Sequence, residues 1–420
     1  MKRVLLLATT TGYQTRMFAA AAERQGLDLI YATDRCDQLE DPWRDGAIPV
    51  RFHEEWRSVD GLLKALETRP IDGVLAVGDR PTVMASQVAR LLNLPGHPPD
   101  AVVAARDKRL AREKFRNTGL LVPNTFAVPM GVDPLTILPR VEFPAVLKPT
   151  VLSGSRGVIR VDDAVGFAAA FLRIRRLLES NDVKELRDPE ADVIQIEQYV
   201  PGAEFALEGL LDQGRLKTIA LFDKPDPLEG PFFEETVYVT PSQMNAGIQT
   251  QITMAVSRAT QALGLYHGPV HAEVRFNTKG PYVLEAAARP IGGLCAKTLR
   301  FERRGQSIGY EDLLLLHAVG EPIDHWRREH RASAVMMIPI PRSGIFRGVD
   351  GVEAASAVPY IEEIEITAKR EQQVLTLPEG ATYLGFIFAR AATARDADGA
   401  LREAHARLRF TIDPLLPIAS

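Results

Sequence analysis

The chain has 420 residues, of which 46% are hydrophobic and 25% are charged, and its formal net charge is −4. These values are typical of a globular protein with two or three domains. The negative net charge argues against a nucleic-acid binder that depends on phosphate contacts. No apolar run approaches the roughly 20 residues that cross a bilayer, so we expect no membrane partner.

The cysteines and the N-terminal residues of the chain indicate the cellular compartment. The two cysteines, Cys36 and Cys295, lie far apart and have no metal-binding spacing. A disulfide framework is therefore not expected, and this usage suits a reducing compartment. The apolar run at residues 4–8 is too short for the hydrophobic region of a secretion signal. We expect a cytoplasmic protein.

The N-terminal part alternates apolar runs with helical patterns. Strands are expected at residues 4–8, 27–32 and 71–77, with a helical pattern through residues 17–22 that ends at Gly26 and a helix at residues 81–92. This alternation predicts a parallel α/β unit, whose ligands lie beyond the carboxyl ends of the strands. Residues 9–12 and Gly78-Asp79 lie at such ends, although a plain turn also explains them. Because G-x-G-x-x-G is absent, a dinucleotide site has little support.

A break rich in Pro and Gly at residues 94–99 indicates the first domain boundary. An amphipathic helix is expected at residues 107–115, and a strand at residues 143–149 carries Lys148 near its end. Residues 153–157, here called the glycine–serine loop, follow before the chain returns as a strand. Backbone N–H groups of such a loop can surround an anion, with the charge of Lys148 beside it. A flexible turn is the alternative.

The remainder of the chain is rich in strand patterns. Helices are expected at residues 163–178 and 242–263, and strands at residues 193–200, 203–211, 216–222 and 235–239. In the last section, strands are expected at residues 335–338, 361–366 and 384–389, and a helix at residues 396–408. An antiparallel sheet with a packed helix is the expected form of this section, and its residues indicate no chemistry.

Residues 270–293 predict a β-hairpin with a turn at residues 277–280. In its first strand, His271, Glu273 and Arg275 alternate with apolar residues and share one face. Strict alternation in the second strand predicts that Val283 and Glu285 share one face. The opposite face would carry Tyr282, Leu284 and Ala286.

The two strands of this hairpin each carry a carboxylate. Opposing side chains on one face lie about 5 Å apart, so Glu273 and Glu285 can sit together, next to Arg289 and His271. Adjacent carboxylates repel unless a cation lies between them. Mg²⁺, held by one or two carboxylates and by phosphate oxygens, is the usual solution. A surface hairpin with scattered charges is the alternative.

Taken in order, these segments resemble the ATP-grasp superfamily. The segments that carry the resemblance are Asp107-Lys108, Lys148 with the glycine–serine loop, Glu197-x₆-Glu204 and the acidic hairpin. The tail is similar to the C-terminal module of the carboxylate–amine ligase branch, to which the L-amino-acid ligases belong.

The resemblance implies a mixed α/β and α+β protein with the ATP-grasp fold. Its N-terminal domain would be Rossmann-like (the pre-ATP-grasp domain), and its C-terminal module would be α+β. The implied units are the pre-ATP-grasp α/β domain at residues 1–100, the small or lid subdomain at 101–200, the large subdomain at 201–325 and the C-terminal module at 326–420.

By resemblance, Lys108 and Lys148 face the phosphates of ATP, and the glycine–serine loop closes over them. The loop residues so implied are Ser153, Gly154, Ser155 and Gly157. The adenosine contacts so implied are the backbone of Gln198, Tyr199 and Val200 at the adenine edge, Glu197 at the adenine amine and Glu204 at the ribose hydroxyls. For Lys108 and for either glutamate, an ordinary surface charge is the alternative.

The resemblance assigns metal binding to Glu273 and Glu285, which would hold one or two Mg²⁺ ions, with Mn²⁺ as a substitute. Relatives usually supply a third ligand two residues after the second acid. This chain has Ala287 there, which leaves the number of ions open.

Three further residues receive catalytic roles by resemblance. Arg289 aligns with an arginine that contacts the acyl phosphate or the substrate carboxylate. Lys224 resembles a basic residue near the γ-phosphate, although an acidic surface loop explains it almost as well. His271 stands where relatives place an anion-stabilising group, and a packed structural histidine is the alternative.

The implied reaction is an ADP-forming ligation of a carboxylic acid or amino acid to an amine through an acyl phosphate. Dipeptides and related amides are its expected products. A bicarbonate-using carboxylase of the biotin-carboxylase or purine-pathway type and a nucleotide-binding relative without activity are the alternatives. The expected partners are small-molecule carboxylate and amine substrates, and a homodimer is left open. The sequence does not specify which acid and amine.

Overall fold

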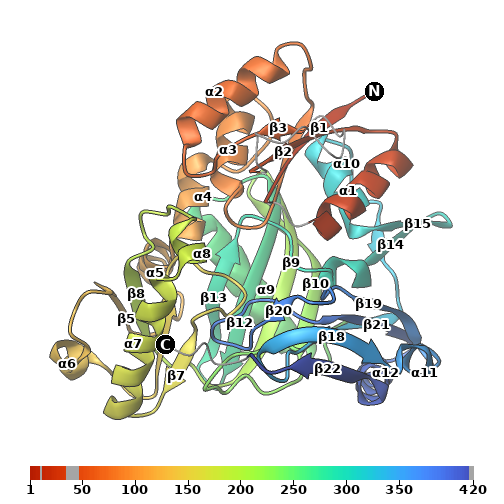
Figure 1. Cartoon of the computed structure of the whole chain (residues 1–420). Helices are drawn as coiled ribbons and strands as arrows, with labels where there is room; N and C mark the ends of the chain where they lie inside the picture. Colours follow the sequence, from red (N-terminus) through yellow and green to blue (C-terminus); the bar gives the residue numbers. More distant parts are fainter. Residues whose placement is uncertain (10–11, 35–46, 416–420) are drawn as a thin grey trace.

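The computed structural model describes residues 1–9, 12–34 and 47–415. Within these ranges the strands form five sheets, which are packed with helices (Figure 1). The mixed α/β and α+β architecture predicted from the sequence is confirmed. Every helix in the described ranges is too short or too polar to cross a bilayer. Thr10 and Thr11, in the first polar strand end, and Cys36 lie outside the described residues.

The N-terminal sheet is parallel and is buried on both faces. Its strands, in spatial order, are β3 (Ile48–Pro49), β2 (Asp28–Thr33), β1 (Arg3–Ala8) and β4 (Gly73–Val77). Leu5 and Leu7 of β1 join one core, and Leu6 joins another on the opposite face, as expected for an unbroken apolar strand. The helices of this unit are α1 (Gly12–Gln25), α2 (Glu55–Leu66) and α3 (Thr82–Leu91).

A helix from much later in the chain completes this unit. α10 (Tyr310–Ala318) packs against α1 and β4, and its cyan ribbon lies beside red elements in Figure 1. Gly73 permits the close approach, because a Cβ there would lie 2.4 Å from the carbonyl oxygen of Ala318. Arg24 of α1 also pairs with Asp312 of α10 at 2.7 Å. The N-terminal unit is thus joined to a distant part of the chain.

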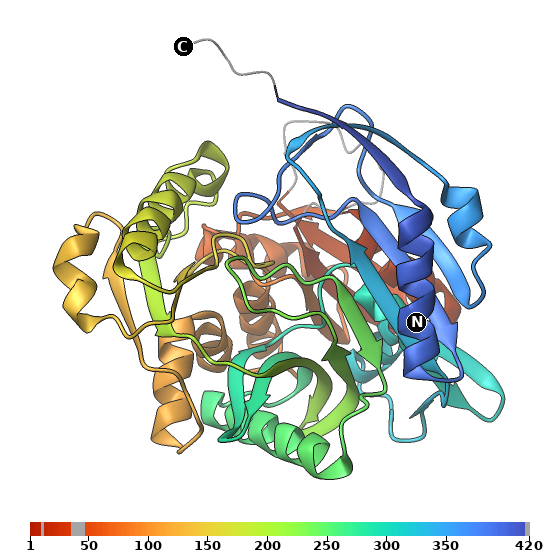
Figure 2. The same cartoon turned by 90° about the horizontal axis from the view of Figure 1, so that it is seen from below.

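A smaller antiparallel sheet forms the unit at the left of Figures 1 and 2. Its strands, in spatial order, are β5 (Thr125–Pro129), β8 (Val193–Gln198), β6 (Ala145–Pro149) and β7 (Ile159–Val161). α7 (Ala164–Leu178) packs against β6 and β7 and buries Phe167 and Phe171. Its first turn is capped by Asp163, whose carboxylate accepts from the N–H of Gly166.

An eight-stranded sheet forms the centre of the molecule. Its strands, in spatial order, are β13 (Gly280–Ala287), β12 (Gly268–Asn277), β9 (Ala203–Asp212), β10 (Arg215–Lys224), β11 (Val237–Thr240), β17 (Ala332–Ile338), β21 (Gly385–Ala391) and β19 (Ile361–Ile366). Pairing of Val237 in β11 with Met336 in β17 joins its two parts. The covering helices are α9 (Ala246–Leu263) on the first part and α12 (Ala394–Arg407) on the second.

The remaining elements are shorter or lie at the margins of these units. The strands are β14 (Arg300–Arg303), β15 (Gln306–Gly309), β16 (Arg327–Arg328), β18 (Gly344–Asp350), β20 (Gln373–Val374) and β22 (Arg409–Asp413). The helices are α4 (Pro99–Arg106), α5 (Lys108–Asn117), α6 (Pro134–Ile137), α8 (Asn181–Lys184) and α11 (Val352–Ser356).

Two predicted boundaries are wrong for local reasons. The helix expected at residues 242–263 begins only at Ala246, because the side chain of Asn245 accepts from the N–H of Ile248 at 3.0 Å and caps the first turn. The strand expected to begin at residue 235 begins at Val237, and Glu235 instead directs its carboxylate to a buried lysine.

Candidate functional site

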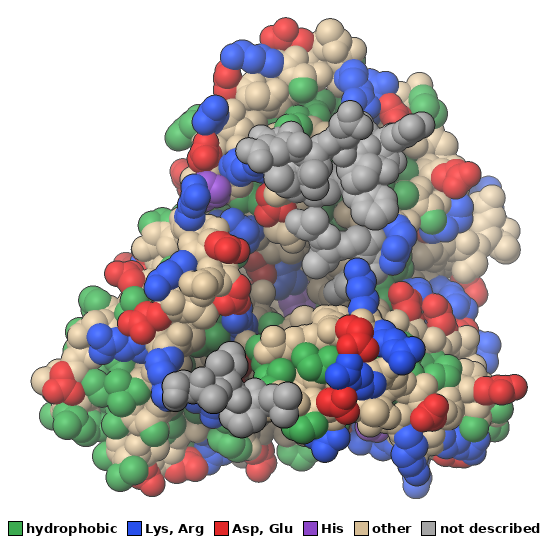
Figure 3. All heavy atoms as spheres, viewed as in Figure 1, with side chains coloured by type: hydrophobic (Ala, Val, Ile, Leu, Met, Phe, Trp, Pro, Cys, Tyr) green, Lys and Arg blue, Asp and Glu red, His purple; other side chains and the backbone are tan. Residues whose placement is uncertain are grey.

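The larger units meet around a hollow that is visible in Figure 3, with basic, acidic and histidine side chains in it. Ion pairs link the units that surround it. Lys108, at the start of α5, lies 4.0 Å from Glu285 of β13. Asp79, which follows β4 of the N-terminal sheet, lies 2.6 Å from Arg289, which follows β13. Residues from the N-terminal unit, α5 and the central sheet are therefore brought together here, including one of the two strand ends singled out in the sequence.

The hairpin of β12 and β13 pairs its two acids directly. Glu273 is the register partner of Glu285, as the sequence predicted. The prediction of strict alternation in β13 is wrong, because a bulge after this pair matches Val274 with Val283. Val283 is fully buried in the core together with Ala286. The extra residue thus lets the core retain Val283 while Glu285 stays opposite Glu273.

Lys224, at the end of β10, lies buried among three carboxylates that come from other strands or loops. Its Nζ donates to Glu204 at 2.8 Å, to Glu235 at 2.5 Å and to Glu273 at 3.1 Å. Burial opposes the charge of Lys224, but the three carboxylates outweigh it and hold the pKa of this lysine well above its ordinary value. Lys224 is thus the cation that these three acids share, while Arg275 and His271 each approach one of them.

The pKa values of two acids in this cluster, which consists of Glu204, Glu235 and Glu273 around Lys224, are shifted in opposite directions. Burial, together with the neighbouring carboxylates, raises the pKa of Glu235 to about 7 although Lys224 opposes the shift. Burial also acts on Glu273, but Lys224 and His271 outweigh it and hold the pKa of Glu273 well below its ordinary value. One oxygen from each of Glu204, Glu235 and Glu273 lies within 4.8 Å of the others. This oxygen-rich geometry suits a hard divalent cation.

Glu197 of β8 is enclosed by cationic and amide donors. Lys148 reaches one of its oxygens at 2.5 Å, and Arg112 of α5 reaches the other at 2.8 Å. The side-chain amide of Gln195 also donates to it at 2.6 Å. Burial opposes ionisation, but Arg112 and Lys148 outweigh it and lower the pKa of Glu197 to about 2. Arg112 was not identified from the sequence, where it reads as one basic residue among several on an amphipathic helix.

Glu204, the next acid along the chain, is held from two sides. Besides Lys224, it accepts from Nε of Arg275 at 2.8 Å. The guanidinium of Arg275 also donates to the carbonyl of Val200 at 2.7 Å and lies over the ring of Tyr199. A carboxylate has about four lone-pair positions, so these two donors leave Glu204 able to accept further hydrogen bonds.

His271 is held as a cation by a buried acid. Glu208 of β9 is fully buried, and it meets Nδ1 of His271 at 2.5 Å. It also accepts from the hydroxyl of Tyr310 at 3.1 Å and from the N–H of Ile291 at 3.1 Å. Burial opposes the charge, but Glu208 outweighs it and raises the pKa of His271 to about 9. Nε2 of the imidazolium lies 3.8 Å from Glu273.

Arg289 receives the same kind of support from Asp79. Burial opposes its charge, but the Asp79 carboxylate outweighs it and raises the pKa of Arg289 further above its ordinary value. His271 is also the register partner of Ala287, which occupies the position where relatives usually supply a third metal ligand. At this place the chain therefore offers a methyl group opposite an imidazolium.

The glycine–serine loop contacts the C-terminal part of the chain. The N–H of Gly157 donates to the carbonyl of Pro378 at 2.9 Å, and Nε of Arg156 donates to the carbonyl of Glu379 at 2.7 Å. Arg173 of α7 donates twice to the Glu379 carboxylate, at 2.6 and 2.9 Å. Sequence reasoning found no chemistry in this last section, because a lone Pro-Glu pair carries no recognisable pattern.

Two families match this chain in separate segments. Residues 141–298 match the ATP-grasp domain, and residues 336–413 match the L-amino acid ligase C-terminal domain 2. The chain therefore contains an ATP-grasp domain, as its motifs predicted. Its second matching segment is a C-terminal domain of the L-amino acid ligase type.

Individual relatives agree with this classification. An uncharacterized protein of Sinorhizobium fredii (strain NBRC 101917 / NGR234) is 25% identical over 99% of this chain and 84% of its own length. Alanine–anticapsin ligase of Bacillus subtilis (strain 168) is 26% identical over 66% of this chain and only 62% of its own length. The crystal structure of L-amino acid ligase from Bacillus licheniformis matches with a TM-score of 0.83 at 26% identity, over 98% of this chain and 99% of that one. The predicted ATP-grasp fold is thereby confirmed.

The proton on His271 predicts a pH dependence of stability. Its pKa is about 9 in the folded chain against an ordinary 6.5, so its contribution is complete below pH 6.5 and is lost as the pH rises through 9. The thermal midpoint should therefore fall between pH 7 and 9. Glu208→Gln removes the carboxylate that retains the proton, and we expect a flatter fall in this variant. Equal slopes in thermal melts of both proteins would contradict the assignment.

Proposed function

We propose that the chain is an ATP-dependent, ADP-forming ligase that joins a small carboxylic acid or amino acid to an amine. The observation that carries this proposal is the register pair of Glu273 and Glu285 beside two cations, His271 and Arg289, that buried acids hold charged. Acids for a metal ion next to cations for developing anions are what acyl-phosphate chemistry requires. The named ligases among the relatives support the same reaction class.

The acidic cluster, together with Glu285 opposite Glu273, fits a divalent metal ion of the Mg²⁺ or Mn²⁺ type. Carboxylate oxygens are the ligands that such hard ions prefer, and Glu273 and Glu285 would hold the ion. We propose Glu235 as the third metal ligand. Its carboxylate approaches Glu273 from another segment, whereas Ala287 has no ligand atom. When bound, the ion would neutralise charge on the phosphoryl group that is transferred.

ATP would be held by the lysines and by the segment after β8. Lys108 and Lys148 supply charge for the phosphates, with the glycine–serine loop closing over them. We assign Glu197 chiefly to positioning Lys148, since the 2.5 Å contact between them is among its three short hydrogen bonds. The backbone of residues 198–200 would meet adenine, and Glu204 would accept from the ribose through its remaining lone pairs.

The reaction would then proceed in two steps. An oxygen of the substrate carboxylate bonds to the γ-phosphorus of ATP as the bond from that phosphorus to ADP breaks, which yields an acyl phosphate. The amine nitrogen next attacks the acyl carbon, loses a proton, and expels inorganic phosphate. Arg289 and His271 would stabilise the oxyanion of the tetrahedral intermediate. Lys224, buried in the acidic cluster, would position Glu204 and Glu273.

A substrate panel tests the proposed ligation. We expect ADP, phosphate and a condensed product, detected by mass, with some pair of an amino acid and an amine. Glu285→Gln should lower this rate at least about a hundredfold, as loss of one preorganised electrostatic group does elsewhere, while its melting curve stays like that of the wild type. Glu113→Gln, an exposed position on the helix that begins at Lys108, is the matched control. Phosphate release with bicarbonate alone, or full activity of Glu285→Gln, would refute this account.

The contact between Arg173 and Glu379 predicts an effect on loop closure. This pair is about 40% exposed, so its loss costs about 0.2–1 kcal/mol, which corresponds to a change of up to about fivefold in an equilibrium. Glu379→Gln should raise KM for ATP by about that factor and increase ADP formation without product, because the loop excludes water less well. Glu371→Gln, which removes a similar exposed pair with Arg347, is the control. Equal KM and coupling in both variants would exclude the role.

A further inference from the structure

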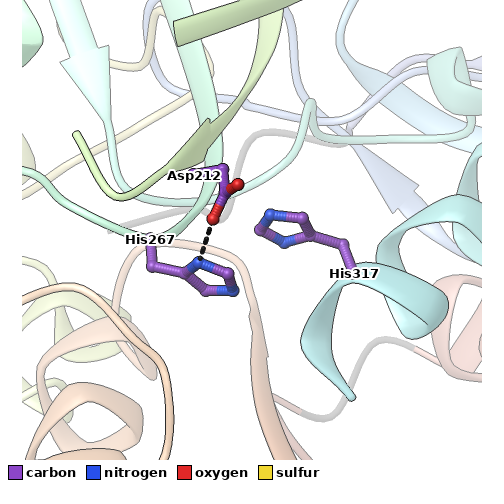
Figure 4. Close-up of side chains that lie close together, drawn as sticks. All are labelled: Asp212, His267 and His317. Atoms are coloured by element: carbon purple, nitrogen blue, oxygen red, sulfur yellow. Dashed lines mark ion pairs between the residues drawn. The ribbon is translucent and has the colours of Figure 1, made fainter. Parts of the chain in front are cut away.

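A second cluster of ligating side chains lies outside the candidate active site. It contains Asp212 at the end of β9, His267 just before β12 and His317 in the last turn of α10 (Figure 4). One ligand atom from each lies within 4.8 Å of the other two. Nδ1 of His267 lies 3.3 Å from an oxygen of Asp212. In Figure 4 the ring of His317 is turned toward this pair.

Two imidazole nitrogens of the cluster lack hydrogen-bond partners among the described residues, which points to a ligand. Nε2 of His317 is buried and has no hydrogen-bond partner among the described residues, and the same is true of Nε2 of His267. The whole His317 residue is only 5% exposed. A buried polar atom without a partner costs about 1–3 kcal/mol, so two such atoms side by side call for an explanation.

A third histidine nearby provides the contrast. Nδ1 of His97 accepts from the N–H of Tyr266 at 3.1 Å, and its Nε2 lies 3.1 Å from the carbonyl of Pro269. Both nitrogens of His97 are thus engaged, and this residue forms a wall of the site. His267 and His317 differ from it in having a nitrogen to spare.

The electrostatic surroundings favour a cation. Asp212 is acidic, and the last turn of a helix, where His317 lies, carries the negative end of the helix dipole. Lys217 is close enough to oppose a cation, but its ammonium is bound by Asp324 and by the carbonyl of Ile323, both at 3.1 Å.

There is room for water beside the two histidines. A cavity of about 50 Å³ is lined by His97, His267 and His317, and one water needs roughly 10–15 Å³. The rings of His267 and His317 stack with centroids 4.1 Å apart and planes at 13°. Because a metal lies in the plane of each ring that binds it, the two rings must turn out of this stack on binding. The side chain of Asp212 is 70% exposed, which leaves an entry path from solvent.

We propose that Asp212, His267 and His317 form a binding site for a divalent transition-metal ion, with Zn²⁺ as the best match. A carboxylate oxygen and two imidazole nitrogens are ligands that Zn²⁺ takes, and water completes a tetrahedral set. The ion would join α10, which covers the N-terminal sheet, to strands β9 and β12 of the central sheet. Its role is to hold these units together, and it is independent of the proposed ligation.

Metal binding to the full chain tests the proposal. Equilibrium dialysis against Zn²⁺ in excess Mg²⁺, which occupies carboxylate sites, should give one Zn²⁺ per chain, and Co²⁺ should show the visible absorption of a tetrahedral site. His317→Ala should lower the affinity at least about tenfold, the scale on which damage to a metal site acts. Asp212→Asn, at an exposed side chain that leaves the core intact, should also weaken binding. Zn²⁺ should raise the thermal midpoint of the wild type by more than that of His317→Ala or Asp212→Asn.

Two controls separate this site from others on the chain. His330→Ala, at an exposed histidine, should bind Zn²⁺ like the wild type. Glu285→Gln should also retain the ion, even though we expect it to lose ligase activity, which keeps this proposal distinct from the proposed function. Absence of stoichiometric Zn²⁺ binding to the wild type would overturn the proposal. Unchanged affinity in both His317→Ala and Asp212→Asn would overturn it as well.

Discussion

The concentration of carboxylates around one buried lysine is the constraint on which the rest of the site depends. Glu204, Glu235 and Glu273 share Lys224, and Glu285 faces Glu273 across the hairpin. Burial, together with the repulsion between these neighbouring carboxylates, raises the pKa of Glu235 to about 7. In the proposed function, a divalent cation that carries a polyphosphate would relieve this repulsion, and the repulsion would thereby favour binding of a metal nucleotide.

The cations of the site depend on acids from other strands and, in the case of Arg289, from another unit. Asp79 from the N-terminal sheet holds Arg289, and Glu208 from the central sheet holds His271. Tyr310 of α10 completes the hydrogen bonding of Glu208, so the helix that covers the N-terminal sheet also supports the imidazolium. The charges that would act on the acyl group are therefore correct only when the units are packed together. This coupling gives the proposed metal site at the other end of α10 a structural purpose.

The sequence revealed the parts of the site that follow from local pattern. Alternation and a four-residue turn were enough to bring Glu273 opposite Glu285, and an apolar strand ending in Lys148 pointed to a charge beside a loop. The bulge in β13 was not predictable, because whether Val283 or Leu284 enters the core depends on how tightly the helices behind the sheet pack. The start of α9 depends on the cap at Asn245, and the start of β11 depends on the contact of Glu235 with Lys224; the apolar pattern contains neither signal.

Contacts between distant segments were beyond reach of the sequence. Asp79 and Arg289 are 210 residues apart in the chain, and Arg112 meets Glu197 across 85. Each is one charged residue among many until the fold selects its partner. The contact of Glu379 with α7 is of the same kind, as is the meeting of His267, just before β12, with His317 in α10.

A crystal structure with a non-hydrolysable ATP analogue and Mn²⁺ tests the central claim most directly, because anomalous scattering locates the ion without ambiguity. The account predicts an ion bound by Glu273 and Glu285, with triphosphate oxygens completing its ligands and Lys108 and Lys148 beside the phosphates. A nucleotide bound elsewhere, or these two glutamates directed apart with no ion between them, would contradict it.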